Sequence, residues 1–385
     1  MQVQHPIDGR CDERFAAVRR EFERNFCERG EVGAAVTIYL DAEPVVDLWG
    51  GFADAGRERP WLRDTIAHVA STTKGITSIC MHRLVEEGRL DLEAPVARYW
   101  PEFAQAGKDD LPVHLLLSHR AGLPAIRRDL PKGSLYDWTL MTETLAAESP
   151  WWEPGTQHGY HAISFGYLAG ELLRRIDGRT LGRFFRDEIA KPLALDFHIG
   201  LDARHDGRCA EMIPMPRSGA RNPIYKATRK RDSLLARAFN NPPYRPEDLN
   251  TPEWRRAEIP AANGHGSARA LARAYAALAR GGEIDGVQVL SADAVARATT
   301  EQAFGPDAVL LGMPMRYGLG FLLGQRAIPF GPSPRAFGHP GMGGSIAFAD
   351  PDTRIGFGYV VNQLQSGMAG DARGFPLIRA LYDSL

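Results

Sequence analysis

The sequence predicts an α/β (α+β) fold, in which both ends of the chain build one antiparallel sheet flanked by helices and a mostly helical region is inserted between them. Two observations lead to this prediction. Short runs rich in β-branched and aromatic residues occur near the beginning of the chain and again near its end. Segments with a helical spacing of apolar residues fill the middle, where most of them end at a glycine or proline. With 385 residues, of which 44% are hydrophobic, the chain is long enough for two domains or for one domain with a large insertion.

The first elements are expected to be a helix and a hairpin. Residues 12–29 have apolar side chains at spacings of three and four, which predicts an amphipathic helix that packs on a sheet. These side chains belong to Phe15, Val18, Phe22 and Phe26. Residues 34–40 and 45–49 are rich in β-forming side chains and flank the turn residues Asp41 and Pro44, so we expect two strands joined by a turn.

Helices are expected in the middle of the chain and strands after it. The predicted helices "SICMHRLVEEG", "LPVHLLLSHRAGLP", "ISFGYLAGELLRRIDG" and "LGRFFRDEIAKP" end at or near Gly88, Gly122, Gly178 and Pro192. The clearest helix, "SARALARAYAALARGG", has Ser267 as its predicted N-cap. "MRYGLGFLL", "SIAFAD" and "RIGFGYVVNQ" are short and β-rich, so we expect antiparallel strands there, followed by a final helix "FPLIRALYDSL".

This order of elements predicts two domains. Residues 1–75 and 266–385 would form the mixed α/β domain with the antiparallel sheet, and residues 76–265 would form the mostly helical inserted domain. We expect the active site in the cleft between them, because binding sites are often found at domain interfaces. Ser71 lies where the first strand region gives way to helices, which is where such a cleft would be lined.

The charge balance indicates small-molecule partners. A formal net charge of -1 provides no long-range field that would attract nucleic acid or a membrane surface. The first residues are charged and amphipathic, and no later run has transmembrane length, so we expect a cytoplasmic protein. No Cys-x-x-Cys spacing and no histidine cluster with metal-ligand spacing is present, so we expect no disulfide, metal or organic cofactor. The oligomeric state is left open, and a homo-oligomer is compatible with the sequence.

The stretch "VASTTKGIT" contains a serine and a lysine three residues apart. In a helix, Ser71 and Lys74 would share one face, and a hydroxyl beside an amine can become a nucleophile. The chain contains 14 serines and six lysines, and this is its sole Ser-x-x-Lys. An N-capping hydroxyl followed by a solvated lysine would give the same pattern, so the surrounding sequence has to decide.

Other serine-hydrolase patterns are absent or weaker. No serine lies in a Gly-x-Ser-x-Gly motif, so an α/β-hydrolase interpretation has no nucleophile. His119 and His265 suggest a Ser-His pair, but each lies at the predicted end or beginning of a helix, which favours structural roles. The Ser-x-x-Lys class requires a second motif with a polar or phenolic group and a third motif on a strand edge.

Motifs of this kind are present in order. "AHVASTTKGITSICMHRLVEEGRLDLEAPVARYWPEF" and "VHLLLSHRAGLP" resemble the nucleophile region of the serine β-lactamase-like family, which includes class C β-lactamases and penicillin-binding proteins. "EPGTQHGYHAISFGYLAGELL" resembles the second motif region of this family. "FGHPGMGGSIAFADPDTRIGFGYVVNQ" resembles the third, in the His-x-Gly form of the family VIII carboxylesterases. The matches run from about Gly33 to Asn362, and the resemblance implies the family fold and an acyl-serine mechanism.

The resemblance implies roles for the first two motifs. Ser71 is the expected nucleophile, and Lys74 and Tyr160 are the expected groups that accept or pass on its proton. Either of the two could be the base. Tyr160 could shuttle the proton only if a neighbouring ammonium such as that of Lys74 lowered the pKa of its phenol.

The third motif and the segment "NGHGSARALARAYAALA" are expected to bind substrate. His339 and Gly341 match the third motif, and Gly341 would let the strand backbone approach the substrate. The backbone N–H of Met342 would then join that of the nucleophile as the oxyanion hole. Asn263 and His265 are expected to border the pocket.

Two departures from the β-lactamase pattern favour another substrate. Ala162 replaces the asparagine that recognises the amide side chain of the drug. His339 and Pro340 replace the lysine and threonine that face the lactam carboxylate, and the charge of His339 is open. The three reacting groups are nevertheless retained. We therefore expect a carboxylesterase that hydrolyses small, short-chain esters through an acyl-serine intermediate.

Three alternatives remain at this point. An acyltransferase of the same fold would replace water by an alcohol or thiol, which the sequence does not distinguish from hydrolysis. A β-lactamase or a D-Ala-D-Ala peptidase-like hydrolase would retain the same reacting groups. A catalytically silent scaffold is disfavoured, because a scaffold has no need of a lysine buried beside a serine.

Overall fold

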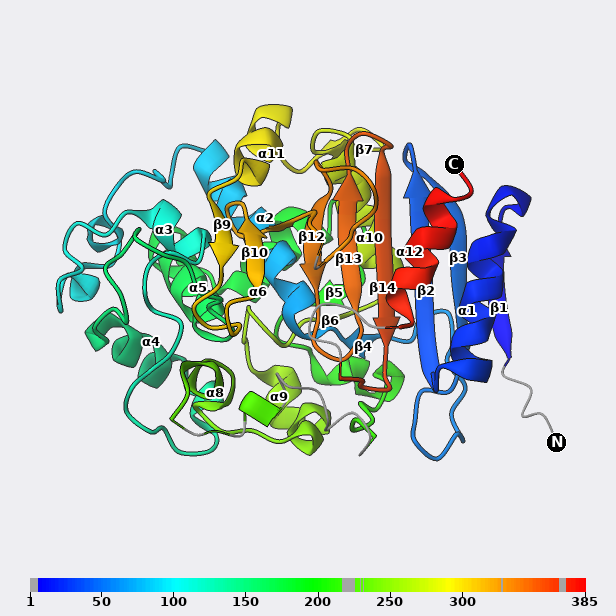
Figure 1. Ribbon diagram of the computed structural model, residues 1–385, viewed down its shortest axis with the longest axis horizontal. Coiled ribbons are helices and arrows are strands. Elements are labelled where there is room, and N and C mark those ends of the chain that lie inside the picture. The colour runs from blue at the N-terminus through cyan, green and yellow to red at the C-terminus, as the bar shows by residue number, and fades with distance from the viewer. Residues whose placement is uncertain (1–5, 217–225, 229, 231, 327, 367–371) are drawn as a thin grey trace.

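A nine-stranded antiparallel sheet forms the centre of the computed structural model (Figure 1). The structure describes all residues except 1–5, 217–225, 229, 231, 327 and 367–371. In spatial order, the strands are β1 (Ile7–Cys11), β3 (Glu43–Gly51), β2 (Gly33–Leu40), β14 (Ile355–Val361), β13 (Ile346–Asp350), β12 (Phe337–Pro340), β11 (Leu322–Leu323), β10 (Pro314–Tyr317) and β9 (Ala303–Pro306). The prediction of one antiparallel sheet built from both ends of the chain is confirmed.

The two ends of the chain meet where β2 pairs with β14. The register runs from Ile355↔Leu40 to Val361↔Ala34, and β14 continues the sheet to β13. Successive side chains of β2 point to opposite faces. Val36 and Ile38 join a hydrophobic cluster with the first and last helices, whereas Ala35 and Tyr39 join a second cluster on the other face.

Helices cover both faces of the sheet (Figure 1). On one face lie α1 (Ala16–Glu28) and α12 (Gly374–Tyr382), and on the other lies α10 (Ala268–Ala279). α10 packs directly on β14, because a Cβ atom added at Gly356 would lie 2.4 Å from backbone atoms of Ala272 and Ala276. Ser267 caps α10 by accepting a hydrogen bond from the N–H of Ala270, as the sequence predicts.

Helices are the main regular elements in the middle of the chain. Its helices are α2 (Thr73–Glu86), α3 (Val113–Leu117), α4 (Trp138–Ala147), α5 (Ser164–Asp177), α6 (Leu181–Phe185), α8 (Leu234–Asn240) and α9 (Pro252–Arg256). α11 (Ala292–Thr299) and the hairpin of β7 (Glu283–Ile284) and β8 (Val287–Gln288) follow α10. None of the helices that the structure describes is long and apolar enough to cross a membrane.

Two helices are shorter than predicted. The helix expected to reach Gly122 ends at Leu117, because His119 adopts a φ of 60°, which is outside the right-handed helical region. The helix expected to end before Pro192 is α6 followed by a π-helical turn, Arg186–Ala190. In both cases the glycine or proline in the sequence lies several residues after the point at which the α-helix ends.

A short three-stranded sheet joins the sheet region to the helical region. It consists of β4 (Ala67–His68), β6 (His265–Gly266) and β5 (Phe197–His198), with β6 in the centre. β4 and β6 therefore bring residues directly before and after the predicted insertion side by side. The domain boundaries at residues 75 and 266 remain a prediction.

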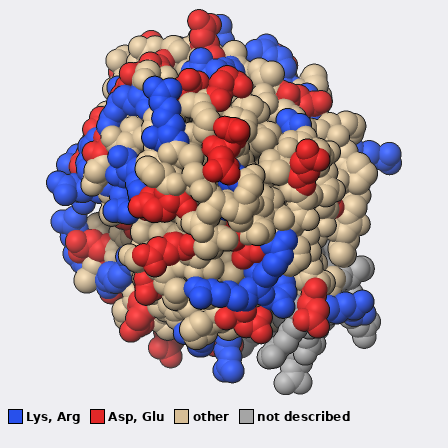
Figure 2. Space-filling view, turned by 90° about the vertical axis from the view of Figure 1, so that its left-hand side faces the viewer, with Lys and Arg blue, Asp and Glu red and all other residues tan. Residues whose placement is uncertain are grey.

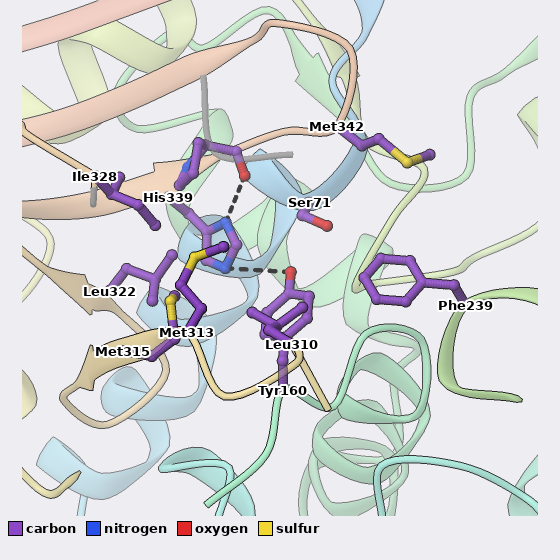
Figure 3. A pocket seen from close by; sticks show the side chains of 11 residues that line it. Ser71, Tyr160, Phe239, Leu310, Met313, Met315, Leu322, Ile328, His339 and Met342 are labelled. Atoms are coloured by element: carbon purple, nitrogen blue, oxygen red, sulfur yellow. Dashed lines mark hydrogen bonds between the residues drawn. The ribbon is translucent and has the colours of Figure 1, made fainter. Parts of the chain in front are cut away.

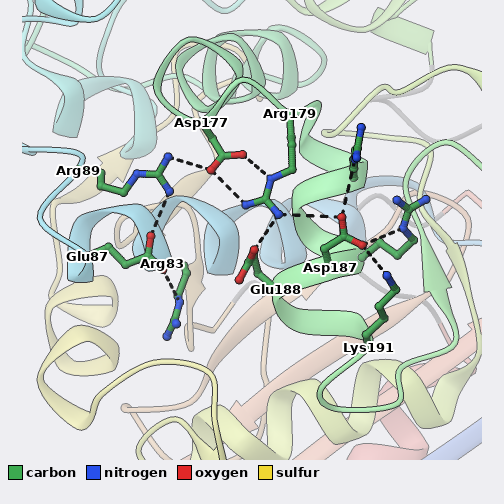
Figure 4. Close-up of polar contacts among 10 residues, drawn as sticks. Arg83, Glu87, Arg89, Asp177, Arg179, Asp187, Glu188 and Lys191 are labelled. Atoms are coloured by element: carbon green, nitrogen blue, oxygen red, sulfur yellow. Dashed lines mark hydrogen bonds and ion pairs between the residues drawn. The ribbon is translucent and has the colours of Figure 1, made fainter.

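The outer surface of the helical region carries both signs of charge. Figure 2 shows lysine and arginine side chains interspersed with aspartate and glutamate on this face. Part of this surface is an ion-pair network between the ends of α2, α5 and α6 (Figure 4). Asp177 accepts hydrogen bonds from Arg89 and Arg179, and Arg179 also pairs with Glu188. The network ties three helices together without creating a surface of one sign.

Candidate active site

The predicted nucleophile and its lysine lie at the beginning of α2. A 3-10 helical turn, Ala70–Thr72, continues directly into α2, so Ser71 and Lys74 share one face. Ala70 has a φ of 46°, a strained conformation for a residue with a Cβ atom, and such strain clusters at active sites. Ser71 is half-buried and Lys74 is fully buried, with 3.4 Å between Oγ and Nζ.

Lys74 is held so that its nitrogen faces the serine. Nζ donates hydrogen bonds to the carbonyl oxygens of Ala162 at 2.7 Å and Ala261 at 2.9 Å. Burial lowers the pKa of the Lys74 amine well below its usual range, which favours the neutral form. A neutral amine has two N–H donors and one lone pair. In this neutral form the two carbonyls would take both N–H groups, and the lone pair would be left for the Ser71 hydroxyl.

Tyr160 lies beside both groups. Its ring centroid is 4.7 Å from Lys74 Nζ, its hydroxyl lies 3.5 Å from Nε2 of His339, and it lines the same cavity as Ser71. Burial raises the pKa of the phenol, and an interaction with Ser71 offsets this only in part. A phenol acting as a base would need a lowered pKa, whereas burial shifts this pKa upward and that of the Lys74 amine downward.

His339 is neutral, and its orientation identifies the tautomer (Figure 3). Nδ1 lies 2.7 Å from the carbonyl oxygen of Pro340, which can only accept, so Nδ1 carries the proton. Nε2 is then an acceptor that faces the Tyr160 hydroxyl. Burial lowers the pKa of His339 to about 3. The site therefore lacks the cation that this position carries in the β-lactamase pattern.

The backbone between β12 and β13 lies against the turn that holds Ser71. Ser345 Oγ donates to the carbonyl of Val69 at 2.8 Å, and a Cβ atom at Gly341 would lie 2.2 Å from the same oxygen. Gly341 thus allows its own backbone to approach the carbonyl of Val69. The sequence analysis expected this glycine to allow the backbone to approach the substrate. The N–H groups of Ser71 and Met342 donate to no other described residue, so both are available to an oxyanion.

Two cavities meet at Ser71. Ser71, Phe239 and Met342 line both of them. The first, which we call the small cavity, has a volume of about 40 Å³, and its other lining residues include Tyr160, His339, Leu310, Met315 and Leu322 (Figure 3). The second, which we call the large cavity, has a volume of about 620 Å³, and its lining includes Ala162, Tyr244, Leu249, Trp254 and Leu364.

Comparison with known proteins identifies the family. Residues 19–379 match the Beta-lactamase family. The chain belongs to this family. It is 40% identical over 380 residues to "Esterase/beta-lactamase LipL" of Mycobacterium tuberculosis, covering 96% of this chain and 86% of that protein.

Solved structures of similar proteins support the same fold. A family VIII carboxylesterase is 44% identical, with a TM-score of 0.92 and coverage of 99% of this chain and 100% of that one. A penicillin-binding protein homologue from Caulobacter crescentus is 42% identical, with a TM-score of 0.90 and coverage of 99% and 100%. The resemblance to the β-lactamase-like family and the predicted fold class are thereby confirmed.

Two of the expected substrate-binding residues of this β-lactamase family member lie away from the cavities. Asn263 is fully buried, where its amide bonds the carbonyls of Trp254 and Ala257 and its oxygen accepts from the N–H of Ile259. His265 is also fully buried, with its ring 5.5 Å from that of His68. Neither side chain lines the small or the large cavity. Both residues shape the backbone behind the site.

The sequence missed two residues that shape the site. Asp307 is fully buried and accepts hydrogen bonds from the N–H of Tyr160 and the hydroxyl of Tyr317, so it fixes the segment that carries the phenol. Phe239, at the end of α8, lines both cavities. The turn residues "FGPD" are the only local feature that singles out Asp307. No group of three or more His, Cys, Asp or Glu side chains among the described residues could hold a metal ion.

Proposed function

We propose that this member of the β-lactamase family is a carboxylesterase that hydrolyses neutral esters through an acyl-Ser71 intermediate. The observation that carries the proposal is the placement of Lys74, whose Nζ is held by the carbonyls of Ala162 and Ala261 and lies 3.4 Å from Ser71 Oγ. The names of the similar proteins, an esterase/beta-lactamase and a family VIII carboxylesterase, support it.

In the first step, Lys74 takes the proton of the Ser71 hydroxyl while Oγ attacks the ester carbonyl carbon. The oxygen of the tetrahedral intermediate accepts hydrogen bonds from the N–H groups of Ser71 and Met342. Tyr160 then donates its proton to the departing alcohol oxygen as the bond between carbon and that oxygen breaks. The Lys74 ammonium returns its proton to Tyr160, and the acyl group remains on Ser71.

In the second step, a water molecule takes the place of the alcohol. Its proton passes through the same groups in reverse, and its oxygen attacks the acyl carbon while Ser71 Oγ leaves and is protonated again. Lys74 is the base in our proposal and Tyr160 is the acid, because burial favours a neutral amine and a protonated phenol. His339 accepts from the Tyr160 hydroxyl and holds it in place.

The charges around Ser71 favour a neutral ester over a lactam. The described residues that line the two cavities include no lysine or arginine, and His339 is neutral. A lactam carboxylate would therefore lie there without a cationic partner, which typically costs about 1–3 kcal/mol or more. Ala162 offers no side-chain amide to the amide group of the drug. Together these effects should lower kcat/KM for lactams by roughly 10²–10⁴-fold relative to esters.

The decisive variant is Ser71→Ala. Hydrolysis of ethyl butyrate should fall by about 10³-fold or more, because the acyl group has no acceptor. A phosphonate inhibitor should label the wild-type peptide that contains "STTK". The matched control is Ser291→Ala, which removes the N-cap serine of α11 far from the site and should lower stability by about 1 kcal/mol while activity is retained.

Retention of a tenth of the wild-type rate by Ser71→Ala would refute the proposed nucleophile. A second comparison separates the esterase from a β-lactamase or peptidase: kcat/KM for a chromogenic cephalosporin and for ethyl butyrate on one preparation. Equal values, or a preference for the cephalosporin, would contradict the esterase proposal. A preparation that forms no adduct with the phosphonate would favour the silent scaffold.

A further inference from the structure

The two cavities that meet at Ser71 differ in which reacting groups reach them. Tyr160 and His339 lie on the wall of the small cavity, whereas neither of them lines the large cavity. Ala162, whose carbonyl binds Lys74, lies on the wall of the large cavity only. Tyr160, the proton donor of the proposed mechanism, can therefore reach a substrate atom only on the small-cavity side of Ser71.

This asymmetry distinguishes the two halves of an ester. The alcohol oxygen must receive a proton as it leaves, so it has to lie within hydrogen-bond reach of the Tyr160 hydroxyl. The carbon chain attached to that oxygen then extends along the wall that Tyr160 and His339 share. The acyl chain, on the other side of the carbonyl carbon, extends toward Ala162.

We propose that the small cavity receives the alcohol part of the ester and the large cavity receives the acyl part, so that the enzyme selects esters of small alcohols with long or bulky acids. This assignment rests on the proposed esterase function and gives its substrate class. It departs from the short-chain esters expected from the sequence, because only the alcohol part of the ester has to be small. Leu310, Met313, Met315 and Leu322 are the side chains that set the limit on the alcohol.

The volumes set the scale of this selection. A water-sized group needs about 10–15 Å³ of such volume, so a cavity of about 40 Å³ holds roughly three of them. Methyl and ethyl groups fit within this space, whereas a hexyl group would have to extend out of it. The large cavity, at about 620 Å³, is in the range of pockets that hold whole drug-sized ligands, and Phe239, Trp254 and Leu249 give it an apolar wall.

The same assignment applies to an alcohol that attacks the acyl-enzyme. An alcohol in the small cavity gives its proton to the relay, its oxygen bonds to the acyl carbon, and Ser71 Oγ leaves and is reprotonated. The products are a new ester and free enzyme, so atoms and charge balance. A short alcohol should therefore compete with water for the acyl group, and a long alcohol should not.

The test measures kcat/KM by titration of released acid for two series of unactivated esters. Nitrophenyl esters are unsuitable here, because nitrophenolate leaves without needing a proton. Among alkyl butyrates, kcat/KM should fall by about tenfold or more from ethyl to hexyl. Among methyl esters, it should rise about fourfold for each of the first methylenes added to the acid.

Variants locate the effect. Met315→Ala widens the small cavity and should raise the hexyl-to-ethyl ratio by about tenfold. Met313→Ala should also raise this ratio. Met313 is only half-buried and lies outside the strands, so this variant should fold and keeps the test valid if Met315→Ala does not fold. The matched control is Leu249→Ala in the large cavity, which should change the dependence on acyl length and leave the alcohol dependence unaltered.

A reversed pattern, with preference for long alcohols and small acids, would overturn the assignment. So would an alcohol dependence that responds to Leu249→Ala and not to Met315→Ala or Met313→Ala. Failure of the proposed function itself is recognisable, since Ser71→Ala would then keep its activity or no ester of either series would be hydrolysed.

Discussion

Lowering the pH from about 7 to about 5.5 should destabilise this protein strongly, well before its carboxylates titrate. The reason is a set of fully buried histidines whose pKa values burial lowers. The pKa is about 4 for three of them and about 3 for a fourth: His68, His82, His161 and His339. Their usual value is 6.5, so below this pH the unfolded chain binds protons that the native state excludes.

The size of the effect follows from these values. The stabilisation is complete above the unfolded pKa of 6.5 and is lost as the pH falls toward the native pKa. Between pH 7 and pH 5.5, each histidine with a native pKa of about 4 removes roughly 1 kcal/mol of the free energy of unfolding. The four groups together remove on the order of 4 kcal/mol, a large share of the 5–15 kcal/mol typical of a protein. Burial raises the pKa of Glu258, and this single group opposes the loss.

The assay is urea unfolding followed by tryptophan fluorescence at the two pH values, with the slope checked for constancy. His82 serves as the control position, because it lies within α2 away from Ser71 and contacts the carbonyl of Leu319 through Nε2. His82→Gln should remove about a quarter of the pH dependence. Equal unfolding midpoints at both pH values for the wild-type protein would refute the reasoning, since the histidines could not then be buried and neutral.

Two further predictions concern the reacting groups. Lys74→Ala and Tyr160→Phe should each lower kcat by about 10²-fold or more, and the double variant should lose little more than either alone, because groups that act as a unit are not additive. In the wild-type enzyme, kcat/KM should rise with pH as Lys74 loses its proton, and a profile flat from acid to neutral pH with fully additive losses would contradict the relay. Asp307→Asn should lower the free energy of unfolding by about 1.5–3 kcal/mol and also lower kcat, because hydrogen bonds to the carboxylate position Tyr160. An unchanged kcat in a destabilised Asp307 variant would limit this residue to a structural role, as melting temperature and steady-state rates would show.

Local features of the sequence predicted local structure well. The Ser267 cap, the hairpin of β2 and β3 and the helical spacing around Phe22 are each determined by residues within one or two turns, and the structure confirms them. The pairing of Ser71 with Lys74 is of the same kind, because three residues of helix are enough to bring them together.

Properties that depend on distant segments could not be predicted. The pKa direction of Tyr160 follows from burial among residues of several elements, which no local pattern contains. Asp307 is 147 residues from the backbone N–H that it binds, and Phe239 reaches the site from α8. For Asn263 and His265, the sequence pattern led to a different kind of error. Both residues lie within a segment that resembles the family, but their side chains line neither the small nor the large cavity.

The position of β14 between β2 and β13 has a consequence for synthesis of the chain. β2 is an eight-residue, largely apolar strand whose partner on that side begins only at Ile355. Translation at about 5–20 residues per second leaves this edge without its partner for roughly 15–60 s after the hairpin emerges. An unpaired apolar edge is a template for association with other chains. A ribosome that stalls or a message truncated before β14 would thus yield an aggregation-prone product, and newly made chains should depend on chaperones until their last strand is released.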